Sequence, residues 1–384
     1  MEKSVSLEKV KNSFPLLAKT VSGFEDLLRL ELEGLGASNL QVLKRAVGFE
    51  GDQELMYRAN YRCRIALRIL KPLKVFEIKE QTTLYEEINK IAWEEFISSK
   101  NSIAVDSVIS DSVFSNSQFV SFRTKDAIID RLRNQSGERP SIDLENPDLR
   151  INVHIFKETC TVSLDSSGRS LHKRGYRVSS GIAPLNEVLA AGLIQLSGWD
   201  KKIPLVDPMC GSGTFLIEGA MLADQIPPGY FKPEFGFMKW RDFDPEVWYK
   251  IKKTEDAGIA PQGCLIRGCD ISSKAIDSAM QNIRFAKMLN RIKVENTPFE
   301  SFKPPEAKGF VITNPPYDER LQIDDIIAFY KKIGDVLKKK YTGYEAWVIS
   351  SDLRALKFIG LHPSKKITVF NGPLECRFVR FSLY

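Results

Sequence analysis

The chain has 384 residues, of which 43% are hydrophobic and 27% are charged, with a net charge of +6 at pH 7. This length predicts two or three compact units, and the composition is that of a globular protein without a biased tract. No uninterrupted apolar stretch approaches the roughly 18 residues that a membrane helix needs, and so modest a charge does not by itself demonstrate nucleic-acid binding.

The N-terminal residues and the cysteines predict a cytoplasmic protein. The first twenty residues include Glu2, Lys3 and Lys11 and contain no apolar core of a secretory signal. The six cysteines are scattered without a CxxC pair, and the chain has three histidines. We therefore expect reduced core cysteines, no membrane and no metal.

The first 165 residues alternate short strands and helices. The expected strands are 16–20, a pair within 40–49, 102–110 and 118–122. The expected helices are 23–32, 84–96 and 125–133. Two further apolar runs, 149–156 and 159–165, are typical of a hairpin. These elements predict an α+β module without a catalytic constellation.

A polar, basic segment follows at residues 166–182, and beyond it strands alternate with longer helices. The expected strands are 204–207, 264–270, 310–313 and 345–350, and the expected helices are 183–196, 214–223 and 272–289. Such alternation predicts an α/β fold with a mostly parallel, doubly wound sheet. The last two apolar runs, 366–370 and 377–383, flank a turn and predict an antiparallel hairpin that completes the sheet.

Two clusters of basic residues are candidates for RNA contact. The first cluster is Arg58, Arg62, Arg64 and Arg68, and the second is Lys173, Arg174 and Arg177. Helical spacing would place Arg58 and Arg62, or Arg64 and Arg68, on one face where they could meet phosphates. A solvated helix face explains the first cluster equally well, and both interpretations stay open.

A glycine-containing loop lies between an expected strand and helix, at residues 205–214. Its two glycines allow a tight turn and let a ligand approach bare backbone. A dinucleotide site would need a third glycine at position 216, which is leucine. The acidic strand end and the early threonine suit a cationic sulfonium amino acid better. The candidate cofactor residues here are Asp207, Pro208, Cys210, Gly211, Gly213 and Thr214.

The next expected strand ends at Asp270 and Ile271. A carboxylate at the tip of this second strand is placed to accept hydrogen bonds from the two ribose hydroxyls of an adenosine. Taken alone, Asp270 could equally be the N-cap of the following helix. Its position after the second strand favours ribose binding.

Asn314-Pro315-Pro316-Tyr317, the tetrad, directly follows the apolar strand 310–313. An exocyclic base amine is a poor nucleophile, because its lone pair is delocalised into the ring. An asparagine oxygen and a backbone carbonyl can hold that amine and stabilise the charge that develops on nitrogen. The prolines stiffen the loop, and the tyrosine offers a stacking face for a flipped base. The alternative is a proline-stiffened turn.

These residues resemble motif I, the acidic second-strand end and motif IV of class I methyltransferases that act on amino groups. The wider pattern of 183–187, 207–214, 227–229 and 235–240 resembles the THUMP-containing RNA guanine-N2 methyltransferases, and most of all the RlmL-like 23S rRNA enzymes. The similarity runs from about residue 14 to the end and is strongest between 171 and 317.

This resemblance implies a domain order, a cofactor and further site residues. It implies a ferredoxin-like region at 1–60, a THUMP RNA-binding domain at 61–165, a basic linker at 166–182 and a Rossmann-like methyltransferase domain at 183–384. The cofactor would be S-adenosylmethionine (SAM). Leu185 and Asn186 would help to hold its methionine end, Asn296 would lie near its adenine, and the insert at 224–262 would lie near the active-site mouth.

The function expected from this resemblance is methylation of guanine N2 in RNA, with 23S rRNA as the partner. A tRNA guanosine stays open, as does adenine N6, because the same tetrad serves adenine in DNA or RNA and glutamine in proteins. A non-enzymatic RNA-binding protein is disfavoured by the glycine loop, Asp270 and the tetrad. A cytosine-C5 enzyme would need a nucleophilic cysteine near the catalytic loop.

Overall fold

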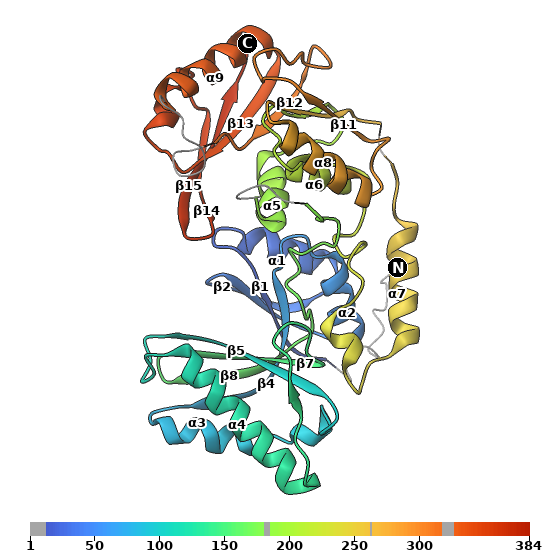
Figure 1. The fold of residues 1–384 in the computed structure, drawn as a ribbon, viewed down its shortest axis with the longest axis vertical. Coiled ribbons are helices and arrows are strands. Elements are labelled where there is room, and N and C mark those ends of the chain that lie inside the picture. The colour runs from blue at the N-terminus through green and yellow to red at the C-terminus, as the bar shows by residue number, and fades with distance from the viewer. Residues whose placement is uncertain (1–12, 180–184, 262, 317–325) are drawn as a thin grey trace, which may run out of the picture. The chain divides into compact units, whose positions relative to one another are not determined.

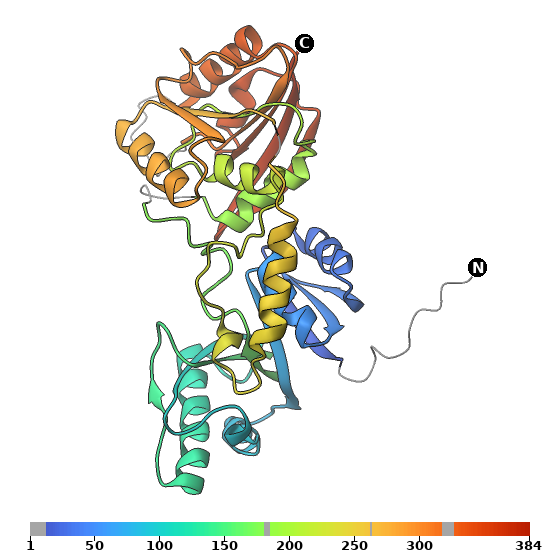
Figure 2. The same cartoon turned by 90° about the vertical axis from the view of Figure 1, so that its right-hand side faces the viewer.

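The computed structural model describes residues 13–179, 185–261, 263–316 and 326–384. It divides into two compact units, which are shown as ribbons in Figures 1 and 2. Unit 1 consists of Met1–Thr20, Leu28–Leu171 and Pro233–Lys253, and unit 2 consists of Val21–Leu27, His172–Lys232 and Thr254–Tyr384. Each unit therefore draws on separate stretches of the chain.

Unit 1 is built on one eight-stranded sheet with the order β2-β3-β1-β4-β8-β7-β5-β6. Its strands are β1 (Phe14–Lys19), β2 (Ser38–Leu43), β3 (Ala46–Gly51), β4 (Arg68–Glu77), β5 (Ser102–Ser110), β6 (Ser141–Ile142), β7 (Leu149–Phe156) and β8 (Thr159–Asp165). The expected hairpin is β7 and β8, which pair in antiparallel register with Ile155 opposite Cys160.

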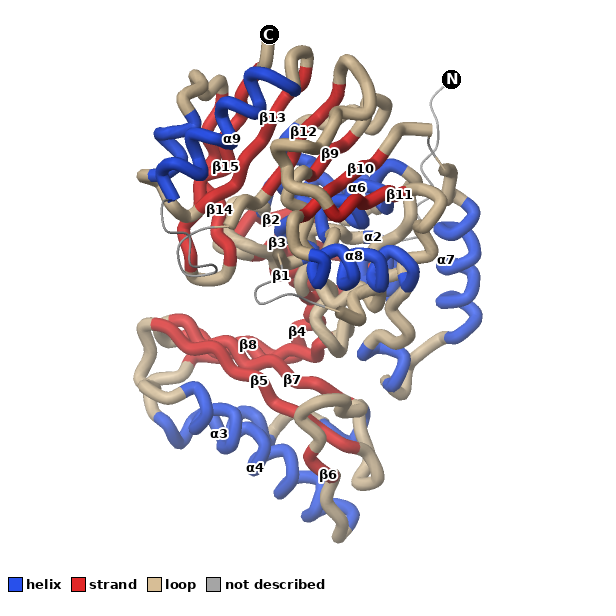
Figure 3. The backbone as a smooth tube through the Cα atoms, turned by 45° about the horizontal axis from the view of Figure 1, so that its top comes forward, coloured by secondary structure: helices blue, strands red, loops and turns tan. Residues whose placement is uncertain are grey.

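Four helices accompany this sheet: α1 (Glu25–Gly34), α2 (Gln53–Arg62), α3 (Gln81–Asn89) and α4 (Ser117–Ser136). Helix α2 begins at Asp52, whose side chain accepts a hydrogen bond from the Leu55 amide, and it ends where Cys63 becomes extended. Helices α3 and α4 lie side by side against the strands β5, β7 and β8, as Figure 3 shows.

The expected strand at 118–122 is wrong, because these residues form the start of α4. Asn116 is the N-cap and accepts hydrogen bonds from the amides of Gln118 and Phe119. The alternating pattern misled because Phe119 and Phe122 are both exposed, at 43% and 54%. Apolar residues on a solvated helix face break the relation between periodicity and burial.

The middle part of the expected insert, Pro233–Lys253, belongs to unit 1 and not to the unit that carries the glycine loop. We call it the insert clasp. It contains the short 3-10 helix η3 (Gly236–Lys239) and most of α7 (Pro245–Ala257). Its aromatic side chains pack on α2 within unit 1, and the expectation that the insert lies near the active-site mouth stays a prediction.

The aromatic packing of the insert clasp explains this placement. The Phe237 ring stacks on Tyr57 of α2, with centroids 4.2 Å apart, and Trp248 meets Tyr61 edge to face at 5.4 Å. The main chain is also held, because the Asp244 amide donates to the Tyr57 hydroxyl at 3.1 Å. Burial of several large aromatic rings contributes more to holding the insert clasp on α2 than any single polar contact of this segment does.

Unit 2 contains a seven-stranded sheet with the order β11-β10-β9-β12-β13-β15-β14. Its strands are β9 (Leu205–Asp207), β10 (Ile266–Asp270), β11 (Ile292–Asn296), β12 (Gly309–Thr313), β13 (Tyr344–Ser350), β14 (Lys365–Asn371) and β15 (Leu374–Ser382). The first five strands are parallel, and β14 and β15 form the expected antiparallel hairpin. The structure confirms the predicted α/β fold class.

Helices cover both faces of this sheet. They are α5 (Glu187–Ser197), α6 (Thr214–Ala223), α8 (Ser273–Phe285) and α9 (Ile326–Lys340). On one face Leu205 lies against Gly219 of α6. On the other face Val206 joins a buried cluster with Tyr330 and Ile333 of α9. Adjacent residues of β9 thus serve opposite layers, which is why this strand is apolar throughout.

Among the described residues, no helix combines the length and the apolar character needed to cross a membrane. The same part of the chain holds no group of three or more histidine, cysteine, aspartate or glutamate residues arranged to ligate a metal ion.

Candidate functional site

The predicted chemistry-bearing residues of unit 2 lie at one edge of its sheet. Asp207, Asp270, Asn296 and Thr313 are the last residues of β9, β10, β11 and β12. These strands are parallel, so their carboxyl ends meet at the same edge. The strand order reverses between β9 and β12, and ligands of open α/β sheets bind in the crevice at such a switch point.

The glycine loop connects β9 to α6 in a tight turn. Gly211 and Gly213 have φ values of 53° and 81°, in the left-handed region that glycine adopts without strain. A Cβ at Gly211 would meet no atom within 4 Å, whereas one at Gly213 would approach the Ala279 side chain at 3.4 Å. The backbone of Gly211 is therefore open to a ligand, and Gly213 permits close helix packing.

Asp207 links the glycine loop to the strand that carries the tetrad. Its Oδ1 accepts hydrogen bonds from the Thr313 hydroxyl at 2.8 Å and from the Met209 amide at 3.2 Å. The side chain is buried, and this burial raises the pKa of the carboxyl to about 7, with a smaller contribution from the Asp270 carboxylate. Asp207 thus supports the loop from a buried position, and its direct contact with a cofactor stays a prediction.

Asp270 holds the glycine loop from the neighbouring strand. Its Oδ2 accepts a hydrogen bond from the Gly211 amide at 2.9 Å, and its Oδ1 accepts one from the Ser272 amide at 2.9 Å. Ser272, and not Asp270, is the N-cap of α8. A carboxylate has about four acceptor positions, so Asp270 keeps capacity for hydroxyl donors beside the open face of Gly211.

Ile271 and Asn296 flank Asp270. The Ile271 side chain is 75% exposed, so it offers an apolar surface beside the carboxylate. The Asn296 amide nitrogen donates to the carbonyls of Asp270 and Ile271, both at 3.0 Å. These two bonds fix the amide orientation and use its nitrogen, which leaves the Asn296 oxygen as the group that could accept from an adenine amine.

Leu185 and Asn186 precede α5. Asn186 is the N-cap of this helix, and its side-chain oxygen accepts hydrogen bonds from the amides of Val188 and Leu189 at 2.9 and 3.3 Å. The Leu185 carbonyl accepts a hydrogen bond from Arg177 at 3.1 Å. Both residues therefore have structural partners at the point where the prediction places the methionine end of the cofactor.

The tetrad begins directly after β12. The Asn314 side-chain oxygen is buried and has no hydrogen-bond partner among the described residues. Pro315 is buried and Pro316 half-buried, while Tyr317 lies outside the described residues. A buried amide oxygen without a donor is costly, so this oxygen fits a ligand that brings an N–H group.

The cysteines of the site are not nucleophiles. Cys210 donates its amide to the Cys269 carbonyl at 2.9 Å, and the Cys269 thiol donates to the Pro208 carbonyl at 3.1 Å. Burial raises the pKa of both thiols, and the carboxylate of Asp207 adds to the effect. A thiol that stays protonated cannot attack a base carbon, which agrees with the argument against cytosine-C5 chemistry.

The first basic cluster does not form a continuous helix face. Arg58 and Arg62 are on α2, and Arg58 pairs with Glu54 at 2.5 Å. The expectation that Arg64 and Arg68 share a helix face is wrong, because α2 ends at Arg62 and Arg68 begins β4. Arg64 is only 6% exposed, and Arg68 pairs with the buried carboxylate of Asp165.

The second basic cluster is also divided by burial. Lys173 is exposed, but Arg174 is 1% exposed and pairs with the buried Glu218 at 3.5 Å. Arg177 pairs with Glu187 at 2.6 Å. The burial of Arg174 therefore contradicts its predicted RNA contact, whereas an RNA contact by the partly exposed Arg177 stays a prediction.

Sequence reasoning missed four residues that shape this site. Thr313 and Ser212 lie next to predicted motifs, and their hydroxyls are bonded to Asp207 and Arg177. Glu187 and Asn282 complete the contacts of Arg177 and Ser212. The signal for Thr313, Ser212 and Glu187 was that each lies in or beside a predicted motif, whereas Asn282 is distant from every motif and gave none.

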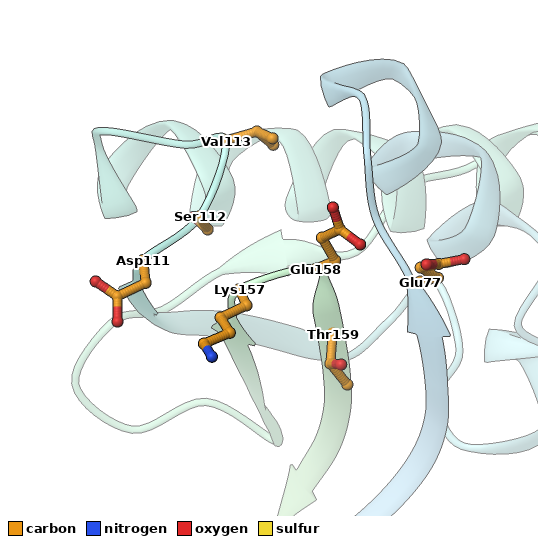
Figure 4. A pocket seen from close by; sticks show the side chains of 7 residues that line it. All are labelled: Glu77, Asp111, Ser112, Val113, Lys157, Glu158 and Thr159. Atoms are coloured by element: carbon orange, nitrogen blue, oxygen red, sulfur yellow. The ribbon is translucent and has the colours of Figure 1, made fainter.

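A surface hollow of about 590 Å³ belongs to unit 1 and not to this site. It is lined by residues from the end of β4, the loop after β5 and the turn between β7 and β8, as Figure 4 shows. Glu77, Asp111 and Glu158 give it carboxylates, and Lys157 is the one cation among its lining residues. Nothing in this hollow resembles the chemistry gathered at the edge of the unit 2 sheet.

Comparison with known protein families matches three parts of the chain. An RlmL ferredoxin-like domain matches residues 15–70, a THUMP domain matches 79–165, and an RMKL-like methyltransferase domain matches 174–380. The chain belongs to the RMKL-like methyltransferase family. The methyltransferase match contains the glycine loop, Asp270 and Asn314.

Two relatives show how far the likeness extends. A putative RNA methyltransferase, slr0064 of Synechocystis sp., is 37% identical over 376 residues, which is 96% of this chain and 97% of that protein. The ribosomal RNA large subunit methyltransferase K/L of Syntrophotalea carbinolica is 37% identical over 379 residues, 95% of this chain and 53% of that protein. The chain thus spans about half the length of this second relative.

A solved structure supports the cofactor. The crystal structure of SMU.472, a putative methyltransferase complexed with S-adenosylhomocysteine (SAH), has a TM-score of 0.85, 28% identity, and coverage of 97% of this chain and 99% of that chain. The cofactor of the RMKL-like chain is SAM, and the residues present fit it. Open backbone at Gly211 and the carboxylate of Asp270 are the features that its adenosyl group requires.

Proposed function

We propose that this RMKL-like protein is a cytoplasmic RNA methyltransferase that acts on the exocyclic N2 of a guanosine in 23S rRNA. The THUMP match and the names of the relatives support an RNA substrate, and ribosomal RNA of the large subunit in particular. The observation that carries the chemistry is the buried Asn314 oxygen at the carboxyl end of β12, which has no hydrogen-bond partner in the part of the chain that the structure describes.

The residues act on the amine by position and hydrogen bonding. Bound SAM supplies a methyl carbon on a cationic sulfur. The Asn314 oxygen accepts one N–H of the base amine, and a backbone carbonyl of the tetrad accepts the other. This turns the nitrogen lone pair toward the methyl carbon and stabilises the positive charge that develops on nitrogen. The proton leaves to water after transfer, because methylation makes the amine strongly acidic.

The same geometry would serve an adenine N6 amine or a tRNA guanosine. Adenine N6 and guanine N2 both present an NH2 group, so the tetrad does not distinguish the two bases. The choice of N2 rests on the family resemblance, and a test of the proposal must therefore identify the product and the RNA that carries it.

The proposal is tested by incubating the protein with labelled SAM and total RNA from a strain that lacks the gene. The RNA is separated by size and digested, and the nucleosides are identified by mass spectrometry. We expect N2-methylguanosine in the 23S fraction. Label in N6-methyladenosine would refute the base assignment, label in tRNA would refute the substrate, and no label in RNA would refute both.

The role of Asn314 has its own expected outcome. Asn314→Ala should lower the transfer rate at least 100-fold, because the amine loses the acceptor that orients it. SAH affinity, measured by calorimetry, should change less than threefold. Asn290→Ala, at an exposed asparagine of the same unit, is the matched control and should retain full turnover. Substantial turnover by Asn314→Ala would remove this residue from the mechanism.

A further inference from the structure

The segment Arg174–Ser179 lies in unit 2 and directs the side chains of Arg174, Tyr176 and Arg177 into it; we call this segment the strap. Arg174 and Tyr176 are each 1% exposed. The Tyr176 hydroxyl donates to the Glu218 carboxylate of α6 at 2.9 Å, and Arg174 pairs with the same carboxylate. The strap is therefore anchored before it reaches the glycine loop.

Arg177 uses its guanidinium group to join three parts of the cofactor site. Its Nε donates to the Glu187 carboxylate at 2.6 Å. Its Nη1 donates to the Ser212 hydroxyl at 3.1 Å, and its Nη2 donates to the Thr214 hydroxyl at 2.9 Å and to the Leu185 carbonyl at 3.1 Å. One side chain thus holds both residues that flank Gly213 and the residue before the α5 N-cap.

The charge of Arg177 is balanced within this arrangement. Burial by itself lowers the pKa of the guanidinium, but Glu187 together with Tyr176 and Glu218 outweighs this effect and raises the pKa above the ordinary value. Glu187 is 3% exposed and is the first residue of α5. A buried ion pair with several hydrogen bonds holds its geometry firmly, since each charge would be costly without the other.

Asn282 of α8 provides a second connection between the strap and the loop. Its side-chain oxygen accepts hydrogen bonds from the amides of Val178 and Ser179 at 3.0 and 3.1 Å. Its side-chain nitrogen donates to the Ser179 carbonyl at 2.8 Å and to the Ser212 carbonyl at 3.1 Å. Asn282 is fully buried, and these four bonds satisfy its amide group.

Ser212 is consequently held at both its hydroxyl and its carbonyl. It lies between Gly211 and Gly213, the two residues with left-handed backbone. A loop that contains two glycines can adopt many conformations. If a ligand binds only one of them, the conformational entropy that the loop loses on ordering weakens the affinity for that ligand. Contacts that fix Ser212 beforehand remove that penalty from cofactor binding.

We propose that Arg177 and Asn282 are positioning residues that preorganise the glycine loop for SAM through Ser212. Neither residue is proposed to touch the substrate or the reacting atoms. The strap segment, which reads in the sequence as a basic RNA-binding linker, thereby acts on cofactor affinity. This inference rests on cofactor binding and is independent of which base or RNA is methylated.

The experiment measures SAH affinity by calorimetry in the full-length protein. Arg177→Ala should weaken SAH binding at least tenfold. Arg177→Lys keeps a charge for Glu187 but cannot reach Ser212 and Thr214 together, so it should give an intermediate loss. Lys173→Ala, at an exposed position just before the strap, should leave the SAH dissociation constant unchanged. Wild-type affinity in both Arg177 variants would overturn the proposal.

Ser212→Ala separates positioning from folding. This variant removes only the hydroxyl and keeps the Arg177–Glu187 pair, so its thermal midpoint should stay within 2 °C of wild type while SAH affinity falls about threefold. In the double variant with Arg177→Lys the losses should be less than multiplicative, because both act on one contact. Fully multiplicative losses would mean that Arg177 does not act through Ser212, and would overturn the proposed route.

The steady-state kinetics supply a second readout. A positioning role predicts that Arg177→Lys and Ser212→Ala raise the KM for SAM by the same factor by which they weaken SAH binding, with kcat changed less than threefold. A large fall in kcat at unchanged KM would place these residues in the chemical step and would contradict the assignment. This comparison requires only a relative rate, so an incorrect base assignment does not affect it.

Discussion

Asp207 is a buried carboxyl whose hydrogen-bond partners stabilise its ionised form but do not outweigh its burial. Thr313 and Met209 both donate to it, yet its pKa is raised to about 7. The carboxyl of an unfolded chain has a pKa near 4. The folded protein therefore binds this proton more tightly than the unfolded chain, and stability depends on pH in the interval between the two values.

The sign of this dependence is testable. The stability contributed by protonated Asp207 is fully present below about pH 4 and is lost as pH rises through about 7. Asp207→Asn cannot ionise and still accepts a hydrogen bond from Thr313, so its thermal midpoint should rise relative to that of the wild type as the pH increases from about 4.5 to about 7. Midpoints that run parallel across this range would show that Asp207 does not titrate there.

Asp270 is expected to contribute directly to cofactor affinity. Asp270→Ala removes a charged acceptor for ribose hydroxyls and also the partner of the Gly211 amide. SAH binding should weaken by roughly 1–3 kcal/mol, the range for hydrogen bonds to a charged group. Glu295→Ala, which removes a carboxylate exposed on the next strand, serves as the control. An unchanged SAH dissociation constant in Asp270→Ala would refute the ribose role.

Candidate site residues could be named from the sequence where the chemistry follows directly from a strand end. Gly211, Asp270 and Asn314 were named because each follows or ends an expected strand, and the structure bonds the Gly211 amide to Asp270; their roles toward a ligand stay predictions. The partners of Arg174 and Arg177 could not, because Glu218 and Glu187 reach them only after folding. A basic residue in a linker looks the same in sequence whether it faces a phosphate or a buried glutamate.

At the scale of elements, the insert clasp shows how a segment can belong to a distant structure. Besides its aromatic contacts with α2, Arg241 donates to the Glu94 carbonyl, and Lys239 donates to the Asn146 carbonyl at 3.2 Å. It thereby connects the part matched by the ferredoxin-like family to residues of the part matched by THUMP. The insert clasp is a structural element of unit 1.

Because the insert clasp is a structural element of unit 1, substitutions in it should lower the stability of that unit without changing the affinity for SAH. Phe237 is fully buried and stacks on Tyr57 and Phe235, so Phe237→Ala should destabilise unit 1 by about 3–5 kcal/mol. Its SAH affinity should equal that of the wild type. Tyr249→Ala, at a residue of α7 that is 68% exposed, should change stability by less than about 0.5 kcal/mol. A loss of SAH affinity in Phe237→Ala would contradict this division.

Most elements of unit 2 could be predicted from the sequence. The start of α4 and the whole of α7, which lie wholly or mostly in unit 1, could not. The short, strongly apolar runs that form β12 and β13 are typical of buried strands between helices. In α4 the first two turns carry the exposed Phe119 and Phe122, and its N-cap Asn116 lies outside the alternating pattern. In α7 only Ile251 is buried, so the sequence contained little periodic signal about the surface on which the helix packs.

For the whole molecule, a net charge of +6 does not locate an RNA surface. Two of the three cations of the second basic cluster, Arg174 and Arg177, are paired with glutamates inside unit 2. Lys173 is the exposed one, which makes it the residue of that cluster whose charge can reach a phosphate. RNA affinity and cofactor affinity should therefore respond to different residues of the same short segment.

This expectation can be checked with a crossed pair of variants. Lys173→Ala should weaken RNA binding and reduce the slope of log affinity against log salt by about 0.7, as expected for one phosphate contact on a single strand. Its SAH affinity should not change. Arg177→Lys should show the reverse, with weaker SAH binding and an unaltered salt slope. An unaltered slope in Lys173→Ala would exclude this lysine from the RNA surface.

The division of the chain into units could not be read from composition. The pattern change near residue 166 was visible, yet unit 1 also includes Pro233–Lys253, and unit 2 includes Val21–Leu27. Pro233–Lys253 is richer in aromatic residues than the chain as a whole, but this enrichment does not say on which surface the rings pack. The long-range packing of these rings assigns the stretch to unit 1.

The discontinuity of unit 1 has a consequence for how the protein is made. The hydrogen bond from Lys252 to Tyr61 joins residues 191 positions apart. At a translation rate of roughly 5–20 residues per second, the insert clasp emerges from the ribosome about 10–40 seconds after α2. During that interval the aromatic side chains of α2 have no partners from the insert clasp. The α2 surface of the nascent chain must therefore stay free of aggregation until residue 253, the last residue of the insert clasp, has been translated.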